Sequence, residues 1–287
     1  MNNKREHHAV PRLYLTGFVE PETSFVWAYA RGRQFRPGKK KGRDNPYRAG
    51  VNVTTTKRDR YTIVAPDGSR QFNTIEDAMR EWEELGKPAL IAAREHRCLA
   101  RPEKEHLARY IGCMWKRVEK RETHATEIYE RELDRWAGLP LRFAELGVFG
   151  RAREAQAALD YLRSPNGQKY SLLRAAVDPL NMMHEGLLRM RWHLLVAPSS
   201  SYFVTSDAPV VFNEAAGLQK SSLGFPISAQ IALLAEWTVG PDLEEVAVTS
   251  EQVRRFNEVI VRGAHKEVFA PRAEEWISEF LSESVDD

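Results

Sequence analysis

The stretch that decides the fold is "WHLLVAPSSSYFVTSDAPVVF", residues 192–212. It is rich in β-branched and aromatic residues and is interrupted by proline and serine, so it predicts short strands at "WHLLVAP", "SYFVTSD" and "PVVFN" joined by turns. Two further strands are predicted at "AQIALLAEW" (229–237) and "KEVFA" (266–270). A helix at 250–263 precedes the last strand, and a short acidic helix follows it. The C-terminal third therefore predicts mainly β-structure.

The N-terminal quarter also predicts strands. "SFVWAYARG" (24–32) and "RYTIVAPDGS" (60–69) carry the same residue types, and the second ends in Pro-Asp-Gly turn chemistry. We expect residues 8–14 to be extended and to pair beside "SYFVTSD". Along such a strand His8, Arg12 and Tyr14 share one face because their spacings are even.

The middle of the chain predicts helices. "TIEDAMREWEEL" begins with a capping-box pattern at Thr74. Gly86 and Pro88 predict a break and a second helix at 88–99, and a longer helix follows from Pro102. Further helices are expected at 151–163, 168–177 and 179–191. Strands at both ends with helices between them predict an α+β fold, with one mixed or antiparallel sheet built from both strand groups.

The length of 287 residues is near the upper limit for one hydrophobic core. We predict a single domain over residues 1–287. Residues 1–72 supply N-terminal strands with a basic loop at 32–56, residues 73–191 supply the helical block, and residues 192–287 supply C-terminal strands and helices.

The charge is distributed unevenly. The net charge is only +2, yet residues 31–60 hold eleven Lys or Arg against Asp44 and Asp59. A solvated loop is one interpretation of this segment. The other is a phosphate-binding segment in which Phe35 and Tyr47 stack on bases. The candidate nucleic-acid-binding residues are Arg36, Lys39, Lys40, Lys41 and Arg43.

The sequence disfavours several classes of protein. No apolar run approaches the ~20 residues that a membrane span needs, and "MNNKREHH" lacks the apolar segment of a secretory signal. Two cysteines outside a CxxC pattern argue against a disulfide scaffold and a cysteine zinc site. We therefore expect a cytoplasmic protein without a membrane partner. Phosphate loops and nucleophile elbows are absent from the sequence, which disfavours kinases, P-loop enzymes, Rossmann oxidoreductases and α/β-hydrolases.

Three groups of residues carry a resemblance to one family. They are a His-x-x-Pro-x-x-Tyr-Leu-x-x-Phe segment, an Ile-Glu pair at a predicted helix start, and a Phe-x-Thr-Ser-Asp-x-Pro-Val segment after a tryptophan. The matching residues are His8, Pro11, Tyr14, Leu15, Phe18, Ile75, Glu76, Trp192, Phe203, Thr205, Ser206, Asp207, Pro209 and Val210.

On these residues the chain resembles the family catalogued as domain of unknown function 4238. A later Pro-x-Ser stretch, Pro226 to Ser228, and a closing pattern with Asn257 and Ala264 are similar too. Ala208 and Ala229 depart from the family pattern, where Asn and Pro are common. The resemblance covers nearly the whole chain and implies no activity.

The candidate site follows from the shared sheet. If the two ends of the chain pair, His8, Arg12 and Tyr14 meet Ser206 and Asp207 in one polar cluster, with Glu76 added from the helix start. An imidazole, a carboxylate to orient it and a guanidinium to hold an oxyanion suffice for phosphodiester cleavage. The alternative is an Arg12–Asp207 ion pair that only fixes the N-terminal strand.

The sequence requires no metal. His7 and His8 are adjacent and point apart in a strand, and no HxH or HExxH pattern occurs. Magnesium held by Glu76 and Asp207 is compatible with these residue types, although no spacing calls for it. The cofactor and the oligomeric state stay open.

Three functional hypotheses follow. The first is a nuclease-like hydrolase acting on RNA or DNA through His8, Arg12 and Asp207. The second is a non-catalytic nucleic-acid or protein binding module that uses the basic segment 31–60. The third is an enzyme on a small anionic metabolite with Arg12 as its anchor.

Overall fold

The computed structural model describes most of the chain. The described residues are 6–8, 10–33, 46–51, 56–58, 62–64, 68–71, 74–97, 99–116, 118–176, 182–213, 221–240 and 242–283. They fall into two compact units. The larger unit comprises His8–Thr56, Glu81–Val118 and Leu180–Asp287, and the smaller comprises Met1–His7, Lys57–Arg80 and Glu119–Pro179. Our single-domain prediction stays a prediction.

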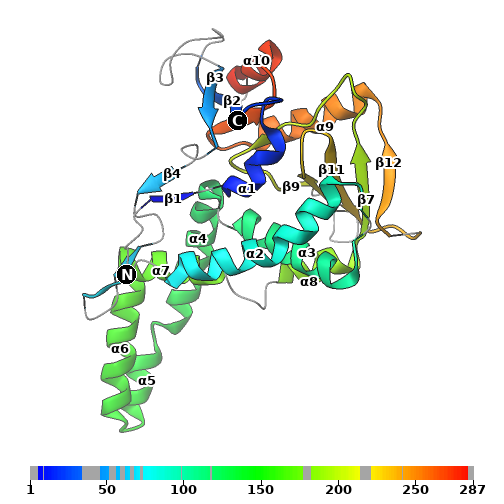
Figure 1. Ribbon diagram of the computed structural model, residues 1–287. Coiled ribbons are helices and arrows are strands. Elements are labelled where there is room, and N and C mark those ends of the chain that lie inside the picture. The colour runs from blue at the N-terminus through cyan, green and yellow to red at the C-terminus, as the bar shows by residue number, and fades with distance from the viewer. Residues whose placement is uncertain are drawn as a thin grey trace. The chain divides into compact units, whose positions relative to one another are not determined.

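The larger unit contains a five-stranded mixed sheet (Figure 1). Its order is β12-β7-β11-β10-β9. The strands are β7 (Arg191–Val196), β9 (Val211–Asn213), β10 (Ser222–Pro226), β11 (Ile231–Glu236) and β12 (Glu244–Ala247). All neighbours are antiparallel except β12 and β7, which run parallel. The sheet is thus made entirely from the C-terminal third.

Three helices cover one face of this sheet. They are α2 (Thr74–Arg94, in this unit from Glu81 on), α3 (Arg101–Lys116) and α8 (Met182–Arg189), which lie together beside β7 and β11 in Figure 1. Registered sheet residues such as Leu194, Phe225 and Leu233 share one buried cluster with Leu90 of α2 and Ile111 of α3. The apolar faces of the helices and the sheet therefore form the main core.

A second sheet joins the two ends of the chain. It has four strands in the order β3-β2-β13-β8, all antiparallel. The N-terminal region supplies β2 (Phe25–Ala30) and β3 (Tyr47–Gly50), and the C-terminal region supplies β8 (Thr205–Ser206) and β13 (Glu267–Ala270). This confirms the α+β class and the expected sharing of a sheet between N- and C-terminal strands.

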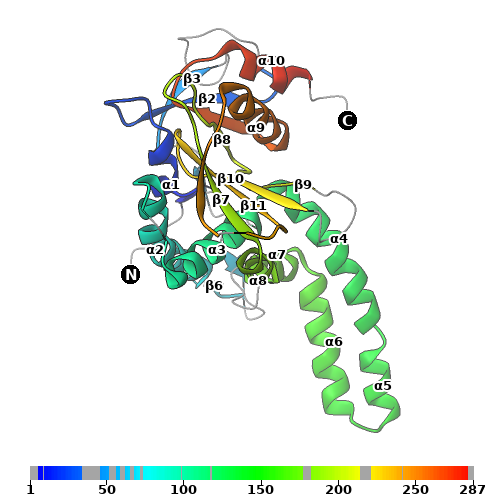
Figure 2. The same ribbon diagram turned by 90° about the vertical axis from the view of Figure 1, so that its right-hand side faces the viewer.

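Helix α9 (Ser250–Gly263) packs against elements of both sheets, and Figure 2 shows it beside β8 and β2. It begins with a complete capping box between Thr249 and Gln252. Ile260 joins a cluster with Tyr29 of β2 and residues of α10 (Glu275–Glu283). Gly224 of β10 lets α9 approach closely, since a Cβ there would lie 3.1 Å from the ring of Phe256.

The smaller unit is mainly helical. It contains the first turns of α2, then α4 (Glu119–Trp136), α5 (Leu139–Glu145), α6 (Phe149–Arg163) and α7 (Pro165–Ala176). Short strands β5 (Ile63–Val64) and β6 (Arg70–Gln71) pair with each other, and Tyr161 of α6 donates to the Val64 carbonyl at 3.2 Å. None of the described helices has the length and apolar character needed to cross a membrane.

The N-terminal strand prediction was wrong in two respects. Only β1 (Glu6–His8) is extended, and it pairs with β4 (Thr56–Arg58), whereas the neighbour of β8 is β13. Residues Arg12–Leu15 form the helical turn α1, continued by the 3₁₀ turn Thr16–Phe18. Pro11 precedes α1 with an extended ψ of 138°, and its carbonyl accepts the N–H of Leu15 at 3.1 Å. Even spacing therefore does not place His8, Arg12 and Tyr14 on one strand face.

Two helix boundaries and the number of sheets also differ from expectation. Helix α2 runs through Gly86 and Pro88 without a break because the following turns bury Ala89, Leu90 and Ala93 in the core. Gly86 is needed there, since a Cβ would lie 2.8 Å from Cβ of Tyr110. The long helix predicted from Pro102 is divided into α3 and α4. The strands that were predicted to form one sheet form two main sheets, of five and four strands.

Candidate functional site

The end of β8 presents three polar residues, each with a defined partner. The Thr205 hydroxyl is 2.7 Å from the hydroxyl of Tyr14. The Ser206 hydroxyl accepts the backbone N–H of Ala208 at 3.1 Å, which closes the local turn. Both residues are fully buried. The site predicted at this strand end is therefore a point where several segments are joined by hydrogen bonds.

Asp207 binds the turn between α9 and β13. Its two carboxylate oxygens accept the backbone N–H groups of His265 at 2.9 Å and Lys266 at 2.8 Å, and its own N–H donates to the Glu267 carbonyl at 2.9 Å. Burial raises the pKa of Asp207, and the hydrogen bonds from the two amides oppose that rise. This geometry uses both oxygens of the side chain to hold backbone.

We expect Asp207→Ala to lower the free energy of unfolding by about 2–3 kcal/mol, because two amide donors lose their acceptor. Asp207→Asn should cost less than Ala, since its amide oxygen still accepts one of the two N–H groups. Urea unfolding followed by circular dichroism gives both values. Glu251→Ala, which removes a carboxylate that is 73% exposed, is the matched control and should stay within about 0.5 kcal/mol. Equal stability of the Ala variant and the wild type would remove this role.

Tyr14 fixes the N-terminal turn to both sheets. It is fully buried, and its hydroxyl donates to the Pro226 carbonyl of β10 at 2.7 Å besides contacting Thr205. Its ring stacks on Phe225 with a centroid distance of 5.2 Å. Burial raises the pKa of Tyr14 well above its usual value, so the phenol stays neutral and acts as a hydrogen-bonding group.

Arg94, at the end of α2, reinforces the same connection. Its guanidinium donates to the carbonyls of Tyr14 at 2.8 Å, Ile227 at 3.1 Å and Leu13 at 3.3 Å. Gly17 leaves room for it, because a Cβ at that position would lie 2.5 Å from an Nη atom of Arg94. Burial lowers the pKa of Arg94. One cation thus satisfies three backbone carbonyls from two distant segments.

Two further residues of the family resemblance act in the same way. Asn257 of α9 accepts the Val204 N–H at 2.9 Å and donates to the Tyr202 carbonyl at 2.8 Å. The Ser228 hydroxyl accepts the N–H groups of Gln230 and Ile231, both at 3.2 Å. These side chains replace water as partners of buried backbone groups. Their residue types are explained by fold maintenance.

The described part of the chain does not test the remaining predicted site residues as a group. Arg12 is exposed on α1, and the backbone of His8 ends β1, with its side chain outside the described set. Glu76 lies in the smaller unit and Asp207 in the larger. Arg36, Lys39, Lys40, Lys41 and Arg43 lie outside the described residues. The assignment of a catalytic cluster stays a prediction.

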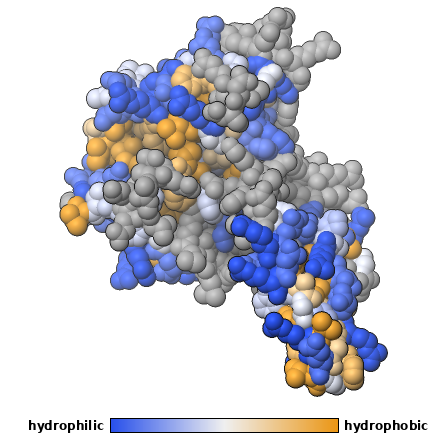
Figure 3. All heavy atoms as spheres, turned by 180° about the vertical axis from the view of Figure 1, so that it is seen from behind, coloured by the Kyte–Doolittle hydropathy of each residue, from blue (hydrophilic) through white to orange (hydrophobic). Residues whose placement is uncertain are grey.

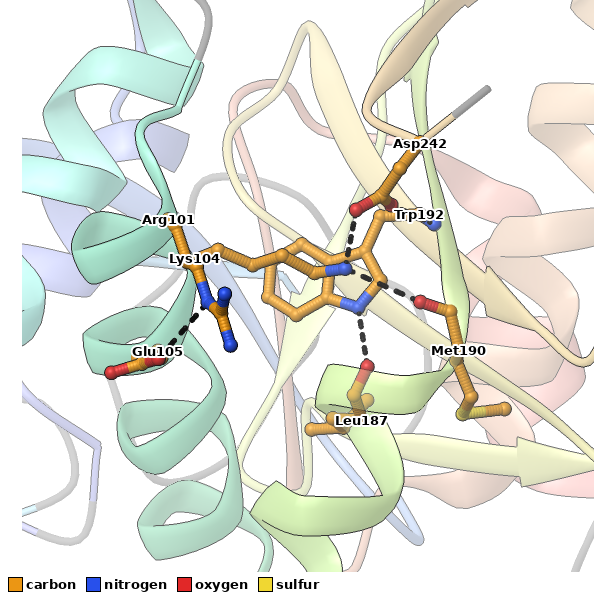
Figure 4. Close-up of polar contacts among 7 residues, drawn as sticks. All are labelled: Arg101, Lys104, Glu105, Leu187, Met190, Trp192 and Asp242. Carbon is orange, nitrogen blue, oxygen red and sulfur yellow. Dashed lines mark hydrogen bonds and ion pairs between the residues drawn. The ribbon is translucent and has the colours of Figure 1, made fainter. Parts of the chain in front are cut away.

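The larger unit contains a buried lysine, Lys104, that the sequence did not indicate; Figure 4 shows its contacts. Lys104 of α3 is 7% exposed, and its ammonium donates to Asp242 at 2.6 Å and to the Met190 carbonyl at 3.3 Å, 4.9 Å from the Trp192 ring. Asp242 also accepts the Trp192 backbone N–H at 2.9 Å, and the indole N–H donates to the Leu187 carbonyl. This cluster holds α3 against the start of β7, and no spacing in the sequence connects its members.

A second unpredicted group lies where β2 and β3 pair. Phe25 is 41% exposed, and the guanidinium carbon of Arg48 lies 5.0 Å from its ring centroid and 5.9 Å from that of Trp27. Arg48 also pairs with Glu20 at 2.6 Å. Phe25 and Trp27 are two residues apart in a predicted strand, so their shared face could have been inferred from the period of two. We call Phe25, Trp27 and Arg48 the aromatic platform.

The described part of the chain contains no group of three or more His, Cys, Asp or Glu side chains that could hold a metal ion. The magnesium hypothesis on Glu76 and Asp207 therefore gains no further ligand among those residues.

Comparison with known proteins identifies the family. The profile of DUF4238, described as a protein of unknown function, matches residues 6–274, so the chain belongs to that family. No curated protein and no solved structure matched the chain.

Proposed function

We propose that this DUF4238 member binds single-stranded nucleic acid through the aromatic platform and the basic segment 31–60. The observation that carries the proposal is the exposed Phe25 ring with the Arg48 guanidinium against it, on a sheet whose strands β2 and β3 flank residues 31–46 of that segment. Nonspecific single-strand binding combines aromatic stacking on bases with cations along the phosphate backbone.

Arg31 and Arg48, two described cations of the segment, differ in how far other groups of the protein occupy them. Arg31 donates to the Ala264 carbonyl at 2.9 Å and to two carbonyls in the last turn of α9, so it serves the C-terminus of that helix. Arg48 stays 48% exposed despite its ion pair. Phosphate binding in this proposal therefore rests on Arg48 and on Arg36, Lys39, Lys40, Lys41 and Arg43, and Arg31 is excluded from it.

We expect the protein to bind a fluorescent single-stranded oligonucleotide with an affinity that falls steeply with salt. Replacing Lys39, Lys40, Lys41 and Arg43 by Ser should weaken binding for every sequence and reduce the salt slope by up to about 3, because each lost phosphate contact contributes about 0.7. Phe25→Ala should cost about 1–3 kcal/mol of binding, and Phe25→Tyr should retain it. Fluorescence anisotropy over a salt series measures both effects.

Matched controls separate a site from general charge. A variant with Lys87, Arg101, Arg189 and Arg255 replaced by Ser also loses four cations, and these four are exposed elsewhere in the larger unit. Val259→Ala removes an apolar side chain that is 48% exposed, as the control for Phe25→Ala. Equal losses in site and control variants, or no binding at low salt, would refute the proposal.

Phosphodiester cleavage by His8, Arg12 and Asp207 remains a separate hypothesis. The two backbone hydrogen bonds to Asp207 favour a structural role for it, so we place binding first. Incubating bound RNA or DNA and analysing it on a denaturing gel tests cleavage directly. Products that disappear in His8→Ala, with binding retained, would establish the hydrolase.

A cytoplasmic location forms part of the same proposal, supported by the low cysteine content.

A further inference from the structure

The turn region between α4 and α6 in the smaller unit exposes an unusual amount of apolar side chain. Five of the nine large apolar side chains that are exposed among the described residues lie between positions 136 and 149. Their exposed fractions range from 41% to 75%, and they are Trp136, Leu141, Leu146, Val148 and Phe149. Figure 3 shows apolar surface gathered at the end of the α5–α6 hairpin. We call these five residues the apolar tip.

The tip is held by defined backbone geometry. Helix α5 packs against α6, and α5 ends in a turn where the N–H of Val148 donates to the Phe143 carbonyl and that of Gly147 to the Ala144 carbonyl, both at 2.9 Å. Gly147 has a φ of +73°, the left-handed conformation that this helix ending requires. Leu146 and Val148 are thus presented from an ordered turn, so little backbone entropy is lost when they are buried.

The charges beside the tip are mainly positive. Between residues 136 and 154 the sequence holds Arg142, Arg151 and Arg153 against Glu145 and Glu154. These three arginines are exposed, and none forms an ion pair with another described residue. Two charged residues in the last turn of α4 do have partners, because Arg135 pairs with Glu132 and Asp134 pairs with Arg163. Three arginines outside any ion pair, with an excess of one over the neighbouring acids, therefore accompany the exposed apolar side chains.

We propose that the apolar tip docks on the surface of an anionic lipid bilayer. Trp, Phe and Leu side chains enter the headgroup region while nearby arginines bind anionic lipid, which is the combination found on interfacial membrane-binding elements. A second copy of this chain is disfavoured as the occupant, since two tips would bring like charges together. The sequence predicts no membrane partner because no segment can span a bilayer, and surface docking needs no span. This inference is independent of the nucleic-acid proposal and concerns the other unit.

Vesicle flotation with the full chain tests the inference. The protein should float with vesicles of phosphatidylcholine containing about one third phosphatidylserine, and much less with phosphatidylcholine alone. Leu146→Ser/Phe149→Ser should weaken binding at least about tenfold, because two large apolar side chains no longer enter the interface. Arg142→Gln/Arg151→Gln should weaken binding to the anionic vesicles and reduce its salt dependence.

Two controls make the result specific. Trp237→Ser/Val239→Ser removes an aromatic and an aliphatic side chain that are 38% and 96% exposed in the larger unit, and it should bind vesicles like the wild type. The variant with Lys39, Lys40, Lys41 and Arg43 replaced by Ser should still bind in a tip-dependent manner. Circular dichroism verifies that each variant is folded.

Three outcomes would overturn the inference. They are a wild type that does not float with anionic vesicles, equal losses in the tip and control variants, and vesicle binding that depends on the basic segment but not on the tip. Sedimentation velocity adds a fourth, since a dimer abolished by Leu146→Ser/Phe149→Ser would assign the tip to a second copy of the chain.

Discussion

Removal of residues 1–18 should abolish cooperative folding of the larger unit. The segment contributes four apolar side chains that are fully buried, namely Val10, Tyr14, Leu15 and Phe18. Burying each is worth about 1.5–3 kcal/mol, so together they supply about 6–12 kcal/mol, which is comparable to the total stability of about 5–15 kcal/mol typical of a domain. The deletion also removes two of the carbonyls that Arg94 binds. Urea unfolding and near-UV circular dichroism of the truncated chain measure the effect.

Arg12→Ala is the control for the deletion. Arg12 is exposed within the same segment, so its truncation should change the free energy of unfolding by no more than about 0.5 kcal/mol. A truncated chain with a native-like near-UV spectrum and a single sigmoidal transition would show that the N-terminal segment is dispensable. That result would also remove the structural role assigned to Tyr14.

The elements predicted best are those in which local signals agree. The helix at 250–263 matches α9 because Thr249 and Gln252 supply a capping box and apolar residues follow the helical period. Strand β2 falls within the predicted segment 24–32 because its aromatic residues alternate with Val26, Ala28 and Ala30, whose face is buried. In both cases burial favours the structure that local propensity already favours.

The failures arise where long-range packing overrides local pattern. Residues 12–15 read as an extended segment, yet they form a helical turn whose Tyr14 meets Thr205, 191 residues away. Pro88 predicts a helix end, and burial of the next turns outweighs the lost hydrogen bond. Lys104 joins Asp242 across 138 residues, which no spacing reveals. The sequence correctly predicted that Tyr14 contacts the "VTSD" strand, but it predicted pairing of two strands where the structure has a helical turn.

The candidate site shows the same limit. The sequence drew attention to Tyr14, Ser206 and Asp207 because polar residues in apolar strand contexts require partners. It could not tell whether those partners are reacting groups or backbone amides, since only the fold places His265 and Lys266 at the Asp207 carboxylate. Phe25 and Arg48, by contrast, combine exposure with adjacency to the basic segment.

Arg94→Ala should lower the free energy of unfolding by about 3–5 kcal/mol, the largest loss expected from a single substitution in this connection. The change removes the guanidinium donor from the part-buried carbonyls of Leu13, Tyr14 and Ile227. The Leu13 carbonyl keeps the Thr16 hydroxyl at 2.7 Å as a donor, and each buried group that is left unpaired costs about 1–3 kcal/mol. Arg94→Lys should recover only part of the loss, because one ammonium does not reproduce the planar array of guanidinium donors. Urea unfolding measures all three proteins.

Gly17→Ala tests whether the guanidinium position itself matters. Its Cβ would lie 2.5 Å from the Arg94 Nη atom, so the new methyl group must displace the guanidinium from its carbonyl partners. We therefore expect Gly17→Ala to destabilise the wild type but to add little in the Arg94→Ala background, a non-additive double-mutant cycle. Arg97→Ala, three residues further on and 53% exposed, is the matched control and should cost less than about 1 kcal/mol. Additive effects of Gly17→Ala and Arg94→Ala, or equal losses for Arg94 and Arg97, would mean that Arg94 does not join the N-terminal turn to the rest of the core.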